Sequence, residues 1–233
     1  MNSFAWNGLT LLPQRAVWRE DSRALFVADV HLGKAAAFRA AGLPVPAGTT
    51  RENLTRLDEL IEALQPRRLI VLGDLFHAPA AYRQTTLREV AAWRARRAGL
   101  AVTLVAGNHD ARAGAPPATL GLELADAPFA LDGLELRHLP LDDDNGDGPP
   151  ALAGHLHPAA RLSGPAHDSL RLPCFVMRGR QLILPAFGEF TGASLATADV
   201  ATALCVVAGD RLIHIPAAAS RRADSLRRSA ARG

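Results

Sequence analysis

Three short apolar runs in the first half of the chain each end at polar residues. The runs cover residues 23–28, 68–72 and 101–105, and the polar residues that follow are Asp29, Gly73-Asp74 and Gly107-Asn108. Continuous apolar runs of this length are typical of parallel strands that are buried on both faces of an α/β sheet. Because ligands in such sheets bind beyond the carboxyl ends of the strands, we expect these polar residues to gather at one edge.

Two segments between these runs repeat their apolar residues at helical spacing. The first extends from Thr49 to Gln65 and the second from Gln84 to Ala98, and both are long enough to connect parallel strands. Thr49 and Glu52 have the spacing of a capping box at the start of the first helix. The pattern therefore predicts alternating strands and helices in the first half of the chain.

After about residue 120 the chain changes to short apolar runs separated by turn residues. The expected strands cover residues 133–136, 151–153, 172–176, 181–184, 202–207 and 211–215. Gly179-Arg180 and Gly209-Asp210 are expected hairpin turns. A helix-rich half followed by a strand-rich half predicts an α/β fold in which two sheets pack together and helices lie outside.

The composition favours one globular domain with a basic end. Of the 233 residues, 48% are hydrophobic and 21% are charged, which suits a single filled core. Five of the 26 basic residues and one of the 23 acidic residues lie in residues 216–233, so residues 1–215 have a net charge of −1 although the whole chain has +3. We predict a single domain over residues 1–215 and a disordered tail over residues 216–233. The net charge gives no argument for nucleic-acid binding by the domain.

Cysteine usage and hydropathy indicate a cytoplasmic protein. Cys174 and Cys205 are too few for a disulfide framework, and both lie in apolar runs that favour burial. No segment reaches the ~18 uninterrupted apolar residues of a membrane-spanning helix, and the N-terminus lacks the pattern of a signal peptide. We therefore expect a cytoplasmic location and no membrane association.

The polar residues at the strand ends belong to an ordered series of short motifs. In chain order these are Asp29-Val30-His31, Gly73-Asp74, Gly107-Asn108-His109-Asp110, His138 and Gly154-His155-Leu156-His157. Any one of them alone is weak support for a metal site, because polar residues after strands usually cap turns. Together they mix carboxylate, amide and imidazole donors, which suits Mn²⁺, Fe²⁺ or Zn²⁺ better than the all-oxygen sites of Mg²⁺ or Ca²⁺.

This series resembles the calcineurin-like metallophosphoesterase superfamily, whose pattern D-x-H, G-D, G-N-H-[DE], H and G-H-x-H is complete here. The resemblance implies a four-layer αββα sandwich of two mixed β-sheets flanked by helices. Longer strings are similar to the bacterial ligase-associated DNA damage response endonucleases, namely residues 29–34, 38–46, 73–77, 154–158, 172–175 and 184–192. One departure is the missing second histidine after the fourth ligand, since Leu139 follows His138 in this chain.

The resemblance implies a role for each motif residue. Asp29, His31 and His157 are expected to hold one divalent metal ion. Asn108, His138 and His155 are expected to hold a second, and Asp74 to bridge both. The two ions, for which we prefer Mn²⁺ over Fe²⁺ or Zn²⁺, would lie about 3.5–4 Å apart and share the hydroxide that attacks the phosphorus.

Five further residues are expected near the reacting phosphate. His109 can protonate the leaving alkoxide, and Asp110 can orient its ring and favour the charged form. His77, Lys34 and Arg39 can bind phosphate oxygens. An ordinary loop role for His77 and a surface or capping role for Lys34 and Arg39 fit the sequence as well.

We therefore expect a binuclear metal-dependent phosphodiesterase that cuts DNA internally, in DNA repair alongside a DNA ligase and an Lhr-like helicase. The DNA substrate and these partners rest on the resemblance, because the same seven ligands serve small-molecule phosphoesterases that act on cyclic nucleotides, nucleotides or phosphomonoesters. A third interpretation, a non-catalytic scaffold, is disfavoured by the complete ligand set. The surface formed by residues 34–48 and 185–192 distinguishes the two enzymes, since an open groove favours a polymer and a closed pocket a metabolite.

Overall fold

The computed structural model of the chain describes residues 2–40, 42–45, 48–77, 84–142, 146–163, 169–189, 191–199 and 202–217. Only the first two residues of the predicted tail over residues 216–233 are among them, so its disorder stays a prediction, as does the single domain over residues 1–215. Within these ranges no helix is both long and apolar enough to cross a membrane.

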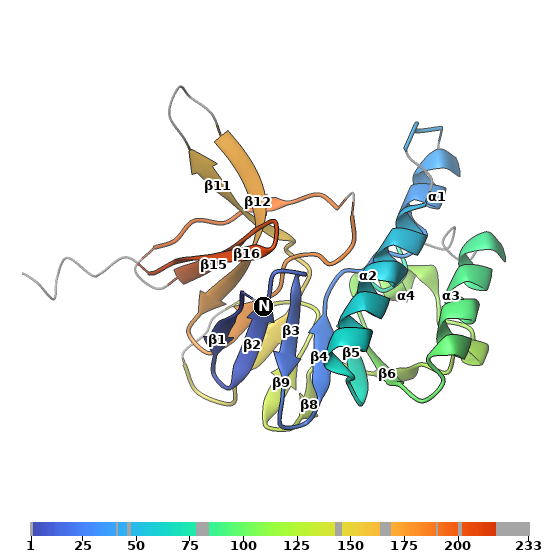
Figure 1. The fold of residues 1–233 in the computed structure, drawn as a ribbon, viewed down its shortest axis with the longest axis horizontal. Coiled ribbons are helices and arrows are strands. Elements are labelled where there is room, and N and C mark those ends of the chain that lie inside the picture. Colours follow the sequence, from blue (N-terminus) through green and yellow to red (C-terminus); the bar gives the residue numbers. More distant parts are fainter. Residues whose placement is uncertain are drawn as a thin grey trace, which may run out of the picture.

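In the described ranges the first sheet contains seven strands, arranged in sequence order (Figure 1). They are β1 (Phe4–Trp6), β2 (Leu9–Leu12), β3 (Ala16–Arg19), β4 (Ala24–Val27), β5 (Arg68–Leu72), β6 (Ala101–Val105) and β7 (Glu123–Ala125). β4 to β7 are parallel, and β1 to β4 pair antiparallel. The three predicted buried strands are thus confirmed as β4, β5 and β6. The apolar pattern does not predict β1 to β3, because strands of three or four residues are too short to show periodicity.

Helices cover one face of this sheet and the second sheet covers the other. The helices are α1 (Lys34–Ala40), α2 (Thr49–Leu64), α3 (Gln84–Arg96), α4 (Asn108–Ala113) and the 3₁₀ turn η2 (Ala118–Leu120). In β4, Leu25 and Val27 belong to the apolar cluster that includes α2 and α3, whereas Phe26 belongs to the cluster between the sheets. Since alternate side chains are buried on opposite faces, the strand has no polar positions.

The predicted helices are confirmed as α2 and α3, but the predicted cap of α2 is wrong. Gly48 is the N-cap and makes no side-chain cap hydrogen bond, although Thr49 and Glu52 have the spacing of a capping box. The first turn of α2 instead supports the loop that follows β4. The hydroxyl of Thr50 accepts a hydrogen bond from the backbone N–H of Gly33 at 3.1 Å, and the side-chain amide of Asn53 donates to the carbonyl of Val30 at 3.0 Å.

The second sheet is mixed and contains nine strands in the described residues. They are β8 (Phe129–Leu131), β9 (Leu134–Leu136), β10 (Ala151–Ala153), β11 (Pro158–Ser163), β12 (Ser169–Arg178), β13 (Gln181–Ile183), β14 (Ser194–Leu195), β15 (Thr202–Ala208) and β16 (Arg211–Ile215). β10 runs parallel to β9 and β13. Both predicted hairpins are confirmed, because β12 pairs with β13 and β15 with β16 across those turns. The two-sheet sandwich with helices outside is confirmed as well.

β12 is longer than predicted and has two different environments. Its second half is buried in the sheet, whereas Ser169 to Pro173 pair with β11 and carry mostly exposed side chains. We call this pair of segments, residues 158–163 and 169–173, the arm. In Figure 1 the arm and α1 project from the same side of the molecule.

Candidate metal centre

The motif residues gather at one edge of the sandwich, which we call the ligand edge. Asp29 follows β4, Asp74 follows β5 and Asn108 follows β6, all at the carboxyl ends of parallel strands. His138 and the Gly154–His157 segment follow β9 and β10 in the second sheet, which are also parallel. Because the two sheets are stacked, their carboxyl ends bring together residues that are up to 128 positions apart.

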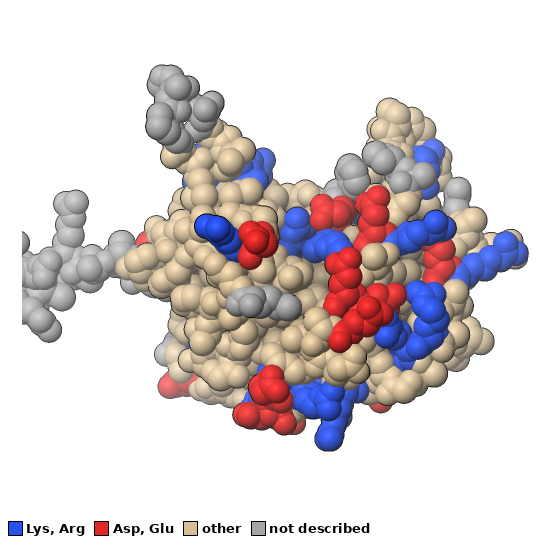
Figure 2. Space-filling view, in the orientation of Figure 1, with Lys and Arg blue, Asp and Glu red and all other residues tan. Residues whose placement is uncertain are grey.

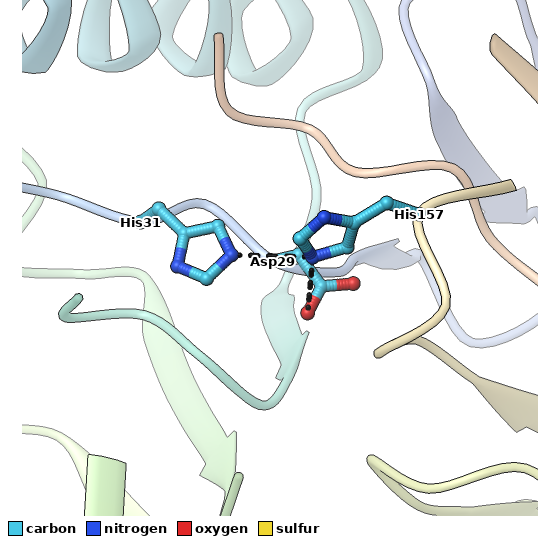
Figure 3. A group of neighbouring side chains, drawn as sticks. All are labelled: Asp29, His31 and His157. Atoms are coloured by element: carbon cyan, nitrogen blue, oxygen red, sulfur yellow. Dashed lines mark hydrogen bonds and ion pairs between the residues drawn. The ribbon is translucent and has the colours of Figure 1, made fainter. Parts of the chain in front are cut away.

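A first group of ligand-type atoms is formed by Asp29, His31 and His157, all within 4.8 Å of one another (Figure 3). The Nε2 atoms of His31 and His157 lie 3.2 Å apart, and Nε2 of His157 lies 3.4 Å from Oδ1 of Asp29. Metal–nitrogen bonds of 2.0–2.1 Å place two imidazole ligands of one ion roughly 3 Å apart. The separation therefore suits two histidine ligands of one ion.

A second group is formed by Asp74, His138 and His155, again within 4.8 Å. Nε2 of His138 lies 3.1 Å from Nδ1 of His155, 3.5 Å from Oδ2 of Asp74 and 2.7 Å from the side-chain oxygen of Asn108. The three residues predicted for the second metal, together with Asp74, are thus brought into one place. The two groups adjoin, since the backbone N–H of His155 donates to Oδ2 of Asp29 at 2.8 Å.

Backbone carbonyls orient two of these imidazole rings. Nδ1 of His138 lies 3.0 Å from the carbonyl oxygen of Leu72, and Nδ1 of His157 lies 3.0 Å from that of Gly192. A carbonyl can only accept, so in each ring Nδ1 carries the proton and Nε2 is left with a free lone pair. Metal-binding histidines commonly make this contact with their other nitrogen.

Burial leaves the first group with unpaired polar atoms. The side chain of Asp29 is fully buried, and its Oδ1 has no hydrogen-bond partner. His31 is 3% exposed, and burial together with the nearby Lys34 lowers its pKa to about 2, so the ring is neutral. Because a buried carboxylate oxygen without a hydrogen-bond donor is costly, a neutral imidazole near Oδ1 of Asp29 fits a cation between them.

The backbone at the ligand edge is held in a conformation that side chains rarely adopt. Positive φ angles of 46° to 70° occur at Asp29, His31, Asp74, His155 and His157. A non-glycine residue in this region costs about 1–3 kcal/mol, and such residues cluster at functional sites. Five of the seven predicted ligands therefore adopt a strained backbone, which the surrounding structure must maintain.

Glycines in the motifs leave room for ligands from other motifs. A Cβ atom on Gly73 would overlap the imidazole of His138, and one on Gly154 would lie 2.7 Å from Oδ2 of Asp29. Gly73, which precedes Asp74, and Gly154, which precedes His155, are thus needed for the close approach of a ligand from a distant segment.

His109 lies beside the two groups with its ring fixed by a neighbouring backbone carbonyl. Its backbone N–H donates to Oδ1 of Asp74 at 2.8 Å, and its Nδ1 lies 2.7 Å from the carbonyl oxygen of His77. Its Nε2 lies 3.9 Å from Oδ2 of Asp74. The ring of His77 stacks on that of His109 with centroids 4.8 Å apart.

The expectation that Asp110 orients the His109 ring is wrong. The carboxylate of Asp110 accepts backbone N–H groups from Asp74 at 2.7 Å, Gly107 at 3.1 Å and Phe76 at 3.2 Å. Burial raises the pKa of Asp110 to about 6, although these three donors oppose the shift. Asp110 therefore ties the loop after β5 to the loop after β6, and it acts on His109 only through the backbone.

Lys34 and Arg39, the two other residues predicted to bind phosphate, lie at opposite ends of α1. Lys34 is 8% exposed at the start of α1, which contradicts a surface role. Burial lowers its pKa, and the carboxylates of Asp29 and Asp74 oppose that shift. Arg39 lies in the last turn of α1, where its guanidinium is 3.4 Å from the carbonyl oxygen of Val45.

Residues 186–189 and 191–192 also reach this edge, as expected for the loop over residues 185–192. The N–H groups of Phe187 and Gly188 donate to the carbonyls of Ala28 and Asp29. Beside His157 there is a pocket of about 170 Å³ whose lining includes Arg15, Arg171 and Glu189. Glu189 lies in the string over residues 184–192 that carries part of the resemblance. Sequence motifs give no signal for Arg15, Arg171 or the orienting carbonyls, because both arginines lie outside all motifs and every residue has a carbonyl.

Comparison with known proteins assigns this arrangement to one family. The model of the protein family "Calcineurin-like phosphoesterase" matches residues 22–179 of the chain. The crystal structure of Pseudomonas putida nuclease MPE is similar at 40% identity and a TM-score of 0.79, covering 92% of this chain and 99% of that one. The structure of Yfce, a phosphoesterase from E. coli, is 17% identical with a TM-score of 0.41, covering 82% and 97%. No curated protein sequence matches the chain.

Proposed function

Because the chain belongs to the calcineurin-like phosphoesterase family and is a metal-dependent phosphoesterase, we propose that it is an endonuclease that hydrolyses phosphodiester bonds in DNA at a binuclear metal centre. The observation that carries the proposal is the pair of adjoining ligand groups with His109 beside them. The similarity to a Pseudomonas putida nuclease over 92% of the chain supports a nucleic-acid substrate.

The proposed metal ligands follow the two groups. Asp29, His31 and His157 would hold one ion, and Asn108, His138 and His155 the other, with Asp74 between them. Two divalent ions supply a water nucleophile of lowered pKa and neutralise charge on the phosphate. The mixture of imidazole, carboxylate and amide donors favours Mn²⁺, with Fe²⁺ or Zn²⁺ as alternatives.

We assign proton transfer to His109. The carbonyl oxygen of His77 accepts the Nδ1 proton of His109, which turns Nε2 toward Asp74, where the scissile phosphate would bind. A proton on Nε2 can then pass to the leaving oxygen. Our candidates for contacts with phosphate oxygens are His77, whose ring stacks on that of His109, and Lys34, which is buried and feels the charges of Asp29 and Asp74.

The shape of the site favours a polymer over a metabolite. Small-molecule pockets are typically ~300–1,000 Å³, whereas the pocket beside His157 has about 170 Å³. Figure 2 shows a hollow surface between the arm and α1 that is open to solvent. A role in DNA repair with a ligase and an Lhr-like helicase rests on the strings over residues 38–46 and 184–192 that resemble the ligase-associated endonucleases.

The proposal is tested by comparing substrates under Mn²⁺ with purified protein of known metal content. We expect nicking of supercoiled plasmid or cleavage of linear single-stranded DNA, and none by Asp74→Ala. Hydrolysis of cyclic nucleotides or a phosphomonoester without any cleavage of DNA would overturn the endonuclease in favour of a small-molecule enzyme. Two bound metals per chain without hydrolysis of any substrate would indicate a scaffold.

A further inference from the structure

The pocket beside His157 lies where the arm meets the body of the molecule. Its lining includes Ala159 of β11, Pro173 and Arg171 of β12, Arg15 of the turn between β2 and β3, and Glu189 of the segment over residues 186–189. Ala159 pairs with Pro173, and Arg161 with Arg171, two positions apart in the register and therefore on the same face of the arm. In Figure 2 basic side chains lie on the side of the arm that faces the hollow.

Arg171 is tethered next to a proposed metal ligand. Its Nη2 donates to the carbonyl oxygen of Ala193 at 2.9 Å, while Nδ1 of His157 donates to that of Gly192 at 3.0 Å. Successive Cα atoms are about 3.8 Å apart, so consecutive peptide groups hold the guanidinium and the imidazole. Arg171 is exposed, and no carboxylate in the described part of the chain forms an ion pair with it.

Arg15 brings a second positive charge to the same pocket. Oε1 of Glu189 is shared by two guanidinium groups, at 3.2 Å from Nη1 of Arg15 and 2.9 Å from Nη1 of Arg56. Arg56 is further occupied by the carbonyl of Phe187 and by the ring of Phe187, 4.4 Å from its centroid. The charged residues that line the pocket are thus Arg15, Arg171 and Glu189, which leaves the lining with an excess of one positive charge.

We propose that Arg171, with Arg15, forms a subsite that binds the phosphate adjoining the scissile one, so that the substrate is a nucleic-acid strand with at least two phosphates. This inference rests on the proposed function. The pocket is too small to enclose a nucleotide, yet its excess charge and forked donors match a backbone phosphate. A strand in the hollow between the arm and α1 would pass from this subsite directly to the first ligand group, because His157 belongs to both.

The test compares two substrates that differ in the second phosphate. One is a single-stranded oligonucleotide, and the other is bis(p-nitrophenyl) phosphate, which has a single phosphate. The variants are Arg171→Gln, which removes the charge, and Arg171→Lys, which keeps the charge without the fork. Arg178→Gln is the matched control, because it removes the same charge from an exposed position of the same strand, roughly 23 Å further along at ~3.3 Å per residue.

For Arg171→Gln we expect kcat/KM on the oligonucleotide to fall about tenfold more than kcat/KM on the chromogenic diester. A factor of about ten corresponds to the weakest hydrogen bonds made to charged groups. The loss should come from KM, and Arg171→Lys should recover part of it. The slope of log Kd against log salt concentration should become shallower by about 0.7, the value for one phosphate contact of a single strand. Arg178→Gln should behave as the wild type on both substrates.

A neutral methylphosphonate placed beside the scissile phosphate sharpens the test. In the wild type it should lower cleavage about tenfold at one of the two neighbouring positions, and in Arg171→Gln it should have little further effect. The subsite is overturned if the variants and the wild type respond alike, or if Arg178→Gln loses as much as Arg171→Gln. Equal losses on both substrates would also overturn it. Wild-type protein that hydrolyses the chromogenic diester but no oligonucleotide refutes the endonuclease proposal itself.

Discussion

Both ends of the sandwich contain non-glycine residues whose backbone adopts the left-handed conformation, but for different reasons. At the ligand edge these positions include the predicted metal ligands Asp29, His31, Asp74, His155 and His157, besides Arg15 in the β2–β3 turn, whereas at the opposite end they include Asn7, Arg23 and Asp132 in the tight turns β1–β2, β3–β4 and β8–β9. We call that end the turn edge. The turn edge uses the conformation to reverse the chain, while at the predicted metal ligands the same conformation aims a polar side chain.

The glycines of the two edges differ in the same way. Gly8 and Gly133 at the turn edge have open space around a Cβ, whereas Gly73 and Gly154 at the ligand edge are packed against ligand side chains. Asn7-Gly8 and Asp132-Gly133 have the sequence of two-residue hairpin turns, in which only backbone conformation matters. At the ligand edge conformation and close packing are required together, so the same kind of substitution should have very different effects.

The largest difference is expected for alanine at Gly73 and Gly133, which have φ angles of 78° and 74°. Gly73→Ala should abolish hydrolysis and lower the free energy of unfolding by more than about 3 kcal/mol, because strain and overlap with His138 add. Gly133→Ala should cost about 1–2 kcal/mol from the backbone alone and keep activity. Urea denaturation and diester hydrolysis measure both effects. Equal losses at the two sites would contradict the distinction between the edges.

A second prediction separates chemistry from metal binding at the ligand edge. His109→Ala should lower cleavage of phosphodiesters about 10²–10⁴-fold, as for loss of a general acid, while both metals remain bound. Rates and metal content per chain are measured on the same samples. His214→Ala is the matched control, since His214 stacks on Phe4 near the N-terminus with centroids 4.6 Å apart. Full activity of metal-loaded His109→Ala would remove His109 from the mechanism.

Removal of metal should destabilise the ligand edge, because Asp29 and Asp74 are buried carboxylates with exposed fractions of 0% and 2%. Mn²⁺ at 100 times its dissociation constant should stabilise the fold by about 2.7 kcal/mol for each of the two sites, relative to protein treated with a chelator. For a chain of this size each filled site should raise the melting temperature by about 5–10 °C. An unchanged melting temperature in the wild type, or the same rise in a variant with both Asp29→Ala and Asp74→Ala, would argue against these ligands.

The smallest effects are expected for glycine substitutions at the left-handed positions themselves. Asn7→Gly should change the free energy of unfolding by less than about 1 kcal/mol and leave hydrolysis unchanged, because glycine adopts this conformation freely. His157→Gly preserves the backbone preference too, but it should lower the bound metal from two ions to one per chain. Metal analysis of the two variants tests whether the side chain or the backbone matters at each edge.

Much of the fold follows from local patterns in the sequence. β5 and β6 begin and end at the predicted residues, and α2 and α3 agree within two residues at each end. These elements are buried on one or both faces, so their apolar residues must recur at the spacing of a strand or a helix. The apolar pattern does not predict β1 to β3. The Asn7-Gly8 turn is nevertheless a hairpin signal, and it lies between the paired strands β1 and β2.

The sequence by itself determined the strands, the donor types and the order of the motifs, since these depend on neighbouring residues along the chain. Only the tertiary structure decided that Asp110 binds backbone N–H groups and that a carbonyl of His77 positions the ring of His109. It also placed Arg171 beside His157, through two successive carbonyls of the 192–193 segment. The physical reason is that such contacts depend on how two sheets stack and where their loops meet, and no local spacing records that.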